Sequence, residues 1–401
     1  MTDDDRVLAL PTAPDAIELR HLRAFVAVAE ELHFGRAASR LYLSQPALSR
    51  QIRALERLVG CELLRRSTHG VELTLAGEAL LAGARQILVQ VDDTVVTARS
   101  VGGEHAERIT RLWDLYVDVT TGGGDLPEVR AAIEQLHGQF TPPDGVDIRP
   151  RNAGGVPSLV LTPQEAGEGT TLFLHGGGHV AGSAFGYRHL AGALAAAAGM
   201  PVLVPEYRLA PEHPFPASLE DAIRAYLSLL DDGTPAERVA VVGDSSGGGL
   251  VASLLIALRD RDLPQPGGVA LLCPWLDLFG ARRPPAESPI VFTADQADRF
   301  AAVYLGGHRT DDPVLTPLRT DLTGLPPMLV QAATGDTVVD DARDFVTHAR
   351  ECGVDAQLEL YPVATHDFHI FWSFLPEGAD AVHRAGRFVA DGVRQAGTAS
   401  A

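Results

Sequence analysis

The chain has 401 residues, of which 46% are hydrophobic and 21% charged, and its formal net charge is −19. This length predicts two or three domains, and the composition excludes a protein that is disordered as a whole. The longest nearly unbroken apolar stretch, Leu190 to Met200, is too short to span a membrane. The acidic N-terminus lacks the pattern of a secretory signal, so we expect a cytoplasmic protein with no membrane partner.

The residue types exclude several kinds of chemistry. Three widely spaced cysteines argue against a disulfide framework and a structural zinc site. All 33 basic residues are arginine, which excludes Schiff-base chemistry and a Walker-type lysine.

The N-terminal part of the chain differs from the rest in charge. Residues 1–16 are expected to form a disordered tail. Between Ile17 and Ala76, nine arginines stand against six acids, so this segment is basic although the whole chain is acidic. Such a charge asymmetry is typical of proteins that contact nucleic acid.

Three helices are predicted within this basic segment. Apolar residues recur at three- and four-residue steps from Leu19 to Ala29, and a second, short helix fits Gly35 to Tyr42. Ser44 is a good N-cap for a third helix, Gln45 to Val59, whose first turn contains Pro46. Two helices joined by a tight turn, the second with serine, glutamine and arginine at its start, are typical of a helix-turn-helix.

A β-hairpin and a long helix are predicted to follow. The hairpin covers Leu63 to Leu73, turns at His69-Gly70 and carries Arg66. Thr74 can cap a helix that continues to about Val101. The alternative interpretation of the whole segment is a solvated three-helix bundle whose arginines only keep it soluble.

The string LRHLRAFVAVAEELHFGRAASRLYLSQPALSRQIRALERLVGCELLRR (19–66) resembles the winged helix-turn-helix of LysR-type transcription regulators. The resemblance implies a DNA-binding domain over 17–76 and a linker helix over 77–101 through which that family forms homodimers. It implies that the major groove is faced by Ser44, Gln45, Pro46, Ser49 and Arg50, and that Arg66 meets the DNA backbone. The periplasmic-binding type of effector domain that this family would lead one to expect next is missing.

From Thr170 onward, β-rich runs alternate with helical stretches, which predicts a mostly parallel sheet with helices on both faces. The predicted strands are Thr170–Leu174, Val202–Val204, Val239–Val242, Val269–Cys273, Met328–Gln331 and Leu358–Tyr361. The predicted helices are Tyr187–Ala198, Ser218–Leu230, Gly247–Arg261, Asp340–Cys352 and Ala381–Gln395.

One predicted strand runs directly into a turn of small residues that contains a serine. Residues 243–247 fit the pattern G-x-S-x-G, in which a sharp turn between strand and helix exposes the hydroxyl of Ser245. Earlier in the chain, His175 precedes three glycines, whose N–H groups can point into a shared cavity and stabilise an oxyanion. The two motifs together predict nucleophilic catalysis.

A nucleophilic serine needs a base, and the base needs a carboxylate that orients it. Asp336 and His366 each follow a predicted strand, where the active sites of open α/β sheets gather. Asp340 and Asp341 compete for the role of the acid, but they fall in the following helix and are typical first-turn charges. His369 competes with His366, although three residues further on its ring would point elsewhere.

These residues resemble the hormone-sensitive lipase-like esterases, also called bacterial family IV. The shared motifs are HGGG (175–178), YRLAPEHPFPASLED (207–221), GDSSGG (243–248) and CPWLDL (273–278). The resemblance implies an α/β-hydrolase fold, with Ser245 as nucleophile, His366 as base and Asp336 as the acid that orients it. It further implies an oxyanion hole made by the N–H groups of Gly177, Gly178 and Ser246, and chemistry without a metal or organic cofactor.

Three positions depart from the family pattern. Ser246 stands where alanine is usual, which leaves its amide available. Thr337 and Val338 follow Asp336 in place of a proline and a leucine. Asp367 replaces the glycine after the histidine, and it places a carboxylate near the base that is expected to raise the pKa of the base.

The hydrolase domain is expected to cover residues 102–396, with its boundary at Gly102-Gly103 and cap segments at about 105–145 and 282–313. We therefore predict a short-chain ester or lactone hydrolase fused to a LysR-like DNA-binding module, in which ester binding or turnover modulates DNA binding. One alternative is a transcription regulator that uses the hydrolase fold only as a ligand receptor. Another is a plain esterase whose N-terminal module is a vestige of gene fusion. Amide hydrolysis is favoured less than ester or lactone hydrolysis.

Overall fold

The computed structural model describes residues 17–41, 43–67, 70–101, 104–280, 293–308 and 312–399. It consists of two compact units, Met1–Val96 and Thr97–Ala401. The predicted tail at 1–16, the boundary at Gly102-Gly103, and residues 282–292 and 309–311 of the predicted insert at 282–313 lie outside the described residues. In the described parts of the chain, no helix is both long and apolar enough to cross a membrane.

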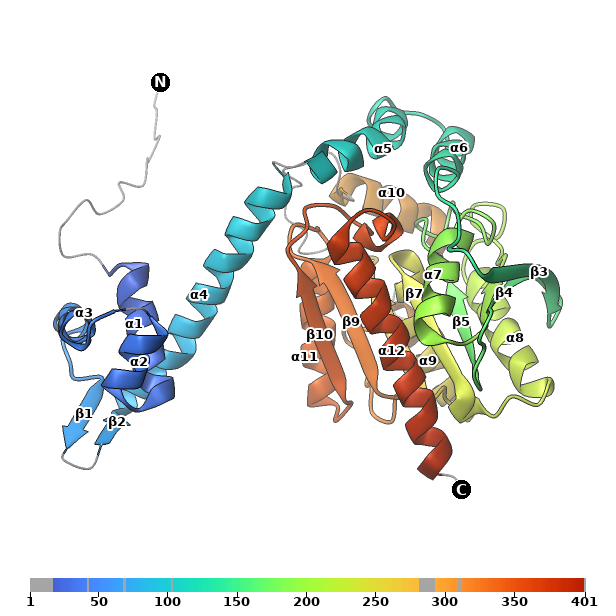
Figure 1. Cartoon of the computed structure of the whole chain (residues 1–401). Helices are drawn as coiled ribbons and strands as arrows, with labels where there is room; N and C mark the ends of the chain where they lie inside the picture. The colour runs from blue at the N-terminus through green and yellow to red at the C-terminus, as the bar shows by residue number, and fades with distance from the viewer. Residues whose placement is uncertain are drawn as a thin grey trace. The chain divides into compact units, whose positions relative to one another are not determined.

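The N-terminal unit is a winged helix-turn-helix, as predicted (Figure 1). Its elements are α1 (Leu19–Glu31), α2 (Phe34–Arg40), α3 (Gln45–Val59), β1 (Leu64–Ser67), β2 (Gly70–Leu73) and α4 (Leu75–Val101). The helix α1 continues two residues beyond the prediction, to a C-cap at Leu32 with a φ of 47°. The helix α2 ends at Arg40, short of the predicted Tyr42, which lies outside the described residues.

Side-chain caps fix where these helices begin. Ser44 caps α3, and its Oγ lies 3.4 Å from the N–H of Ala47. Thr74 Oγ1 accepts the N–H of Gly77 at 3.0 Å at the start of α4. Each cap satisfies one of the N–H groups that a helix start leaves without a partner. Both caps confirm the prediction.

The second unit is an eight-stranded sheet in the order β10-β9-β8-β7-β5-β6-β4-β3. Its strands are β3 (Val146–Ala153), β4 (Val156–Pro163), β5 (Thr170–Leu174), β6 (Val202–Pro205), β7 (Val239–Asp244), β8 (Gly268–Leu272), β9 (Met328–Ala333) and β10 (Ala356–Tyr361). The strands from β5 to β10 pair in parallel, and β3 and β4 add an antiparallel hairpin at one edge. All six predicted strands are present, with ends that differ by up to two residues.

The hairpin of β3 and β4 was not predicted from the sequence. Its turn is Gly154-Gly155, with φ angles of 60° and 90° that favour glycine. A two-residue glycine turn between runs of apolar residues is a known hairpin signal. It precedes Thr170, where the predicted alternation of strands and helices begins.

Helices cover both faces of the sheet, as predicted (Figure 1). The helices α7 (Arg188–Ala198) and α12 (Pro376–Ala399) pack together on one face, and α8 (Ala217–Asp231), α9 (Ser246–Asp260) and α11 (Val339–Glu351) cover the other. Three further helices, α5 (Glu104–Thr121), α6 (Leu126–His137) and α10 (Ala294–Leu305), lie over the carboxyl end of the sheet. Residues of all three helices line the cavity over Ser245.

Candidate active site

The turn between β7 and α9 holds Ser245 in a strained conformation. Its φ is 50° and its ψ is −122°, values that side-chain-bearing residues rarely adopt. The glycines around it are needed for space. A Cβ on Gly243 would overlap the carbonyl oxygen of Gly247, and one on Gly247 would overlap that of Leu174. The local sequence therefore forces a sharp turn that presents the serine hydroxyl at the carboxyl end of the central strand β7.

The structure brings the three predicted catalytic side chains together. Ser245 Oγ lies 2.8 Å from Nε2 of His366, and Nδ1 of His366 lies 2.6 Å from Oδ2 of Asp336. Ser245 follows β7, Asp336 follows β9, and His366 follows β10. All three are buried. This chain of two hydrogen bonds has the geometry of a serine nucleophile with an oriented base.

The competing acids and the competing histidine have other partners. Oδ2 of Asp341 accepts the N–H groups of Leu276 and Asp277, at 3.1 and 2.9 Å. Asp340 forms an exposed ion pair within α11. Nε2 of His369 lies 3.1 Å from the amide oxygen of Gln331. None of these contacts joins Asp340, Asp341 or His369 to Ser245.

The glycine loop lies against the serine turn. Gly177 and Gly178 have φ angles of 117° and 65°, and a Cβ on Gly177 would overlap the carbonyl oxygen of Ala181. The N–H of Ser246 is the first of α9, where an orphan donor and the positive end of the helix dipole coincide. Both glycines line the same cavity as Ser245. The three predicted oxyanion donors thus lie on the backbone that borders the nucleophile.

The hydroxyl of Ser246 has a contact that the sequence did not predict. Its Oγ accepts the N–H of His179 at 3.3 Å, which joins the serine turn to the glycine loop. The ring of His179 stacks on Tyr304 with 3.8 Å between centroids, so His179 acts as a packing residue. Ser246 therefore ties together the two segments that carry the oxyanion donors.

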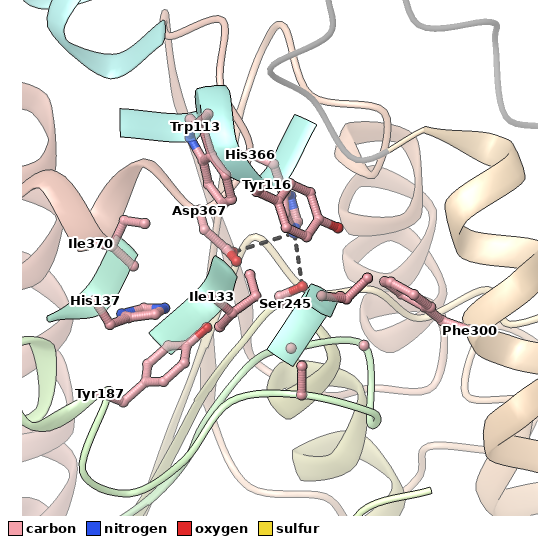
Figure 2. Close-up of a pocket in the computed structure, with 14 residues that line it drawn as sticks. Trp113, Tyr116, Ile133, His137, Tyr187, Ser245, Phe300, His366, Asp367 and Ile370 are labelled. Carbon is pink, nitrogen blue, oxygen red and sulfur yellow. Dashed lines mark hydrogen bonds and ion pairs between the residues drawn. The ribbon is translucent and has the colours of Figure 1, made fainter. Parts of the chain in front are cut away.

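The cavity over Ser245 has apolar, largely aromatic walls (Figure 2). Its labelled lining residues are Trp113 and Tyr116 from α5, Ile133 and His137 from α6, Tyr187 beside α7, Phe300 from α10, and Ile370. The space open to the centre of a water-sized sphere is about 40 Å³, room for a few waters or a short acyl group. Trp113, Tyr116, Ile133, His137 and Phe300 belong to no motif, so the sequence predicts only the two segments, 105–145 and 282–313, that contain them.

The base is surrounded by negative charge. Oδ1 of Asp367 lies 3.4 Å from Nε2 of His366, on the side of the ring that faces Ser245. Burial lowers the pKa of His366, but the carboxylates of Asp336 and Asp367 outweigh it and raise that pKa to about 9. Burial also raises the pKa of Asp367 to about 7. The departure from the family glycine thus places a carboxylate beside the base, as expected from the sequence.

Comparisons with known proteins agree with this geometry. Residues 171–370 match the family described as alpha/beta hydrolase fold. LipR, a putative acetyl-hydrolase of Mycobacterium tuberculosis, is 38% identical over 257 residues, which cover 63% of this chain and 83% of that protein. The chain belongs to the α/β-hydrolase family.

Solved structures place this α/β-hydrolase in the hormone-sensitive lipase-like branch of carboxylic-ester hydrolases. The crystal structure of an esterase from the bacterial hormone-sensitive lipase family has a TM-score of 0.67 and 35% sequence identity. The match covers 71% of this chain and 98% of that one. The predicted family and fold are both confirmed.

The N-terminal unit of the α/β-hydrolase chain has relatives of a different kind. Residues 19–78 match the bacterial regulatory helix-turn-helix proteins of the lysR family. YnfL, a helix-turn-helix transcriptional regulator of Escherichia coli, is 63% identical over 82 residues, which cover 20% of this chain and 28% of that protein. The chain therefore carries a LysR-type helix-turn-helix, a DNA-binding module, before the hydrolase unit.

The predicted DNA-contacting residues gather at the start of α3. Ser44, Gln45, Pro46 and Arg50 are exposed there, and Ser49 is half-buried. The opposite face of α3 buries Leu48, Ile52 and Leu55 in the core of the unit. Arg66 lies in β1, paired with Val71 in β2. This arrangement leaves one face of α3 available to a DNA groove.

Proposed function

We propose that the hydrolase unit cleaves short-chain carboxylic esters with Ser245 as nucleophile, His366 as base and Asp336 as the orienting acid. The observation that carries this proposal is the buried pair of hydrogen bonds, at 2.8 and 2.6 Å, that links the three side chains. Nε2 takes the hydroxyl proton as Oγ attacks the acyl carbon, and it then gives that proton to the leaving alkoxide. Water attacks the acyl–serine, losing its proton to Nε2, and the carboxylic acid is released as Oγ is reprotonated.

The backbone around the nucleophile suits the charge that develops in this reaction. The N–H groups of Gly177, Gly178 and Ser246 are proposed to bind the oxyanion of the tetrahedral intermediate. Positive φ angles at both glycines and the N-terminal position of Ser246 in α9 support this assignment. A single donor of this kind contributes about 3 to 4 kcal/mol to the transition state.

The cavity supports a short acyl group. Its walls are bulky, and Phe300 closes one side against Gly178, where a Cβ would overlap the phenyl ring. The relatives named acetyl-hydrolase agree with this size, and one of them, from Streptomyces hygroscopicus, is 42% identical over 224 residues, which cover 55% of this chain and 75% of that protein. Open-chain esters and small lactones both present an ester carbonyl to the serine, so rates on the two classes of substrate must be compared to separate them.

We expect kcat/KM to fall by about tenfold or more from p-nitrophenyl acetate to the octanoate, because each methylene beyond the cavity has no place to pack. The test compares the acetate, butyrate and octanoate with γ-butyrolactone, which is followed by acid release in a pH-stat. Equal rates on all three linear esters would contradict the short acyl cavity. Absence of turnover by the folded protein would favour a ligand receptor instead.

We further propose that the chain is a homodimeric regulator in which occupancy of the ester site changes DNA binding. Its proposed parts are a DNA-binding domain at 17–76, a linker helix at 77–101 and a hydrolase domain at 102–396. The chain supports a route for such coupling. The helix α5 follows α4 after two residues, and its Trp113 lines the cavity. Nε1 of Trp113 also donates to Oγ1 of Thr365, at 3.1 Å, next to the base. The helix α4 supports the dimer, because it exposes Leu75, Ile87 and Val89.

Sulfonylation of Ser245 by phenylmethylsulfonyl fluoride is expected to change the affinity for DNA by several-fold, because the adduct fills the cavity that α5 covers. The probe is the duplex that the full chain enriches from a random pool, measured by fluorescence anisotropy at fixed salt. Ser245→Ala, which the reagent cannot modify, is the control for the adduct, and Arg50→Ala is expected to weaken binding about tenfold. Equal affinity before and after modification would remove the regulatory proposal.

A further inference from the structure

The nitrogen of the base that faces the serine has a second oxygen beside it. Nε2 of His366 lies 2.8 Å from Oγ of Ser245 and 3.4 Å from Oδ1 of Asp367. The side chains of His366 and Asp367 are 7% and 8% exposed, so water and salt screen their interaction little. In Figure 2 the two dashed lines meet at the ring of His366, one from each neighbour.

The backbone holds the Asp367 carboxyl in this position. Its φ is 50°, in the left-handed region that aspartate enters more readily than most side chains, and a 3-10 helix begins directly after it at Phe368. Oδ1 is buried and accepts no hydrogen bond from the described part of the chain. A buried carboxylate oxygen without a donor is costly unless a cation faces it. A protonated Nε2 supplies that cation.

Other titratable groups also face this pair. They are Asp336, Asp244, Cys273, Tyr116, Tyr187 and His369. Burial raises the pKa of the thiol and of both phenols further above neutral, so these three groups are uncharged near pH 7. Burial also raises the pKa of the Asp244 carboxyl, and this carboxyl adds to the charges that raise the pKa of His366. Burial lowers the pKa of His369 to about 3, so it is uncharged as well. The carboxylates of Asp336 and Asp367 therefore stabilise the positive charge on His366.

We infer that Asp367 is a positioning residue that keeps a proton on Nε2 of His366 in the resting site, so that Ser245 becomes a nucleophile at alkaline rather than neutral pH. In the resting site Nε2–H is shared between Asp367 and Ser245, and the serine keeps its own proton. When hydroxide removes the Nε2 proton as water, the lone pair of Nε2 can accept the proton of Ser245. This inference rests on the proposed ester hydrolysis, because it concerns the same base.

The test is the pH profile of kcat/KM for p-nitrophenyl acetate between pH 6 and 10, for the full chain and for Asp367→Gly and Asp367→Asn, with the rate of Ser245→Ala subtracted. Both Asp367 variants are expected to move the rise of kcat/KM with pH, which reports loss of the Nε2 proton, by about one pH unit or more toward neutral pH. The rate at pH 7 is then expected to rise about tenfold. The matched control is Asp340→Asn, an exposed acid in α11. Its profile is expected to follow that of the wild type.

The outcomes distinguish this inference from the proposed function. Turnover in both Asp367 variants with a pH profile of kcat/KM that does not shift would overturn the inference and leave the esterase intact. A fall in kcat/KM by the same factor at every pH would also overturn it, because it would show that Asp367 only supports the turn. No turnover at any pH would overturn the esterase. In that case, the rate at which phenylmethylsulfonyl fluoride modifies Ser245, followed by intact mass against pH, tests the same proton on Nε2. A profile unchanged in Asp367→Asn would again reject the inference.

Discussion

Replacement of Ser245 by alanine is expected to reduce kcat for p-nitrophenyl acetate by about a million-fold. The hydroxyl is the group that forms the acyl intermediate, and its Oγ lies 2.8 Å from Nε2 of His366. The rate that remains would come from the oxyanion donors and from substrate binding alone. The measurement is a steady-state assay, with the thermal midpoint recorded for each variant.

The matched control for this prediction is Ser228→Ala. The Ser228 hydroxyl donates to the carbonyl of Ala225 within α8, and Ser228 does not line the cavity. This variant is expected to keep the wild-type rate within about threefold. Activity in Ser245→Ala well above that of a buffer blank would mean that the ester is cleaved elsewhere, and the assignment of the nucleophile would then be wrong.

Replacement of Asp336 by asparagine is expected to reduce kcat by about ten-thousand-fold. The carboxylate accepts the Nδ1–H of His366 at 2.6 Å, so the lone pair of the neutral imidazole lies on Nε2, where it can take the serine proton. An asparagine can instead donate to Nδ1, and the imidazole proton would then lie on Nε2, where it blocks the base. Loss of this carboxylate also lowers the pKa of His366, because Asp336 is the largest of the charges that raise it.

Asp341→Asn separates the acid of the triad from its sequence neighbour. Asp341 binds the backbone of the segment after β8, at Leu276 and Asp277, so its replacement is expected to lower the thermal midpoint more than kcat. A fall in kcat for Asp341→Asn as large as that for Asp336→Asn, at equal folded fraction, would contradict the assignment. Circular dichroism and kcat measured on the same samples distinguish a loss of folded protein from a loss of catalysis.

Much of this site could be predicted because its constraints are local. The turn at Ser245 requires glycines where a Cβ would overlap backbone, and such a requirement is written directly in the sequence. Asp336 and His366 are far apart in the chain, but each follows a parallel strand, and the carboxyl ends of such strands share one edge. Strand order was therefore not needed to bring the three residues together.

What could not be predicted depends on packing between distant segments. Trp113 reaches the catalytic loop from a helix without any motif, and only the fold places its indole N–H at Thr365. The hydroxyl of Ser246 appeared dispensable in the sequence, yet it bridges two loops. The distance from Asp367 to Nε2 likewise depends on a side-chain rotamer and a left-handed backbone. Sequence periodicity carries no information on such contacts.

The position of α5 has a consequence for how the chain can be divided. A fragment that begins at Val146 would retain every strand of the large sheet and all three residues of the serine–histidine–aspartate chain. It would lack Trp113, Tyr116, Ile133 and His137, which line the cavity. The smallest catalytic fragment with a closed pocket is therefore expected to start upstream of α5, close to the end of α4. The residues that shape the cavity and the residues that follow α4 thus share the same stretch of polypeptide, so a cut made there to separate the two units also changes the substrate site.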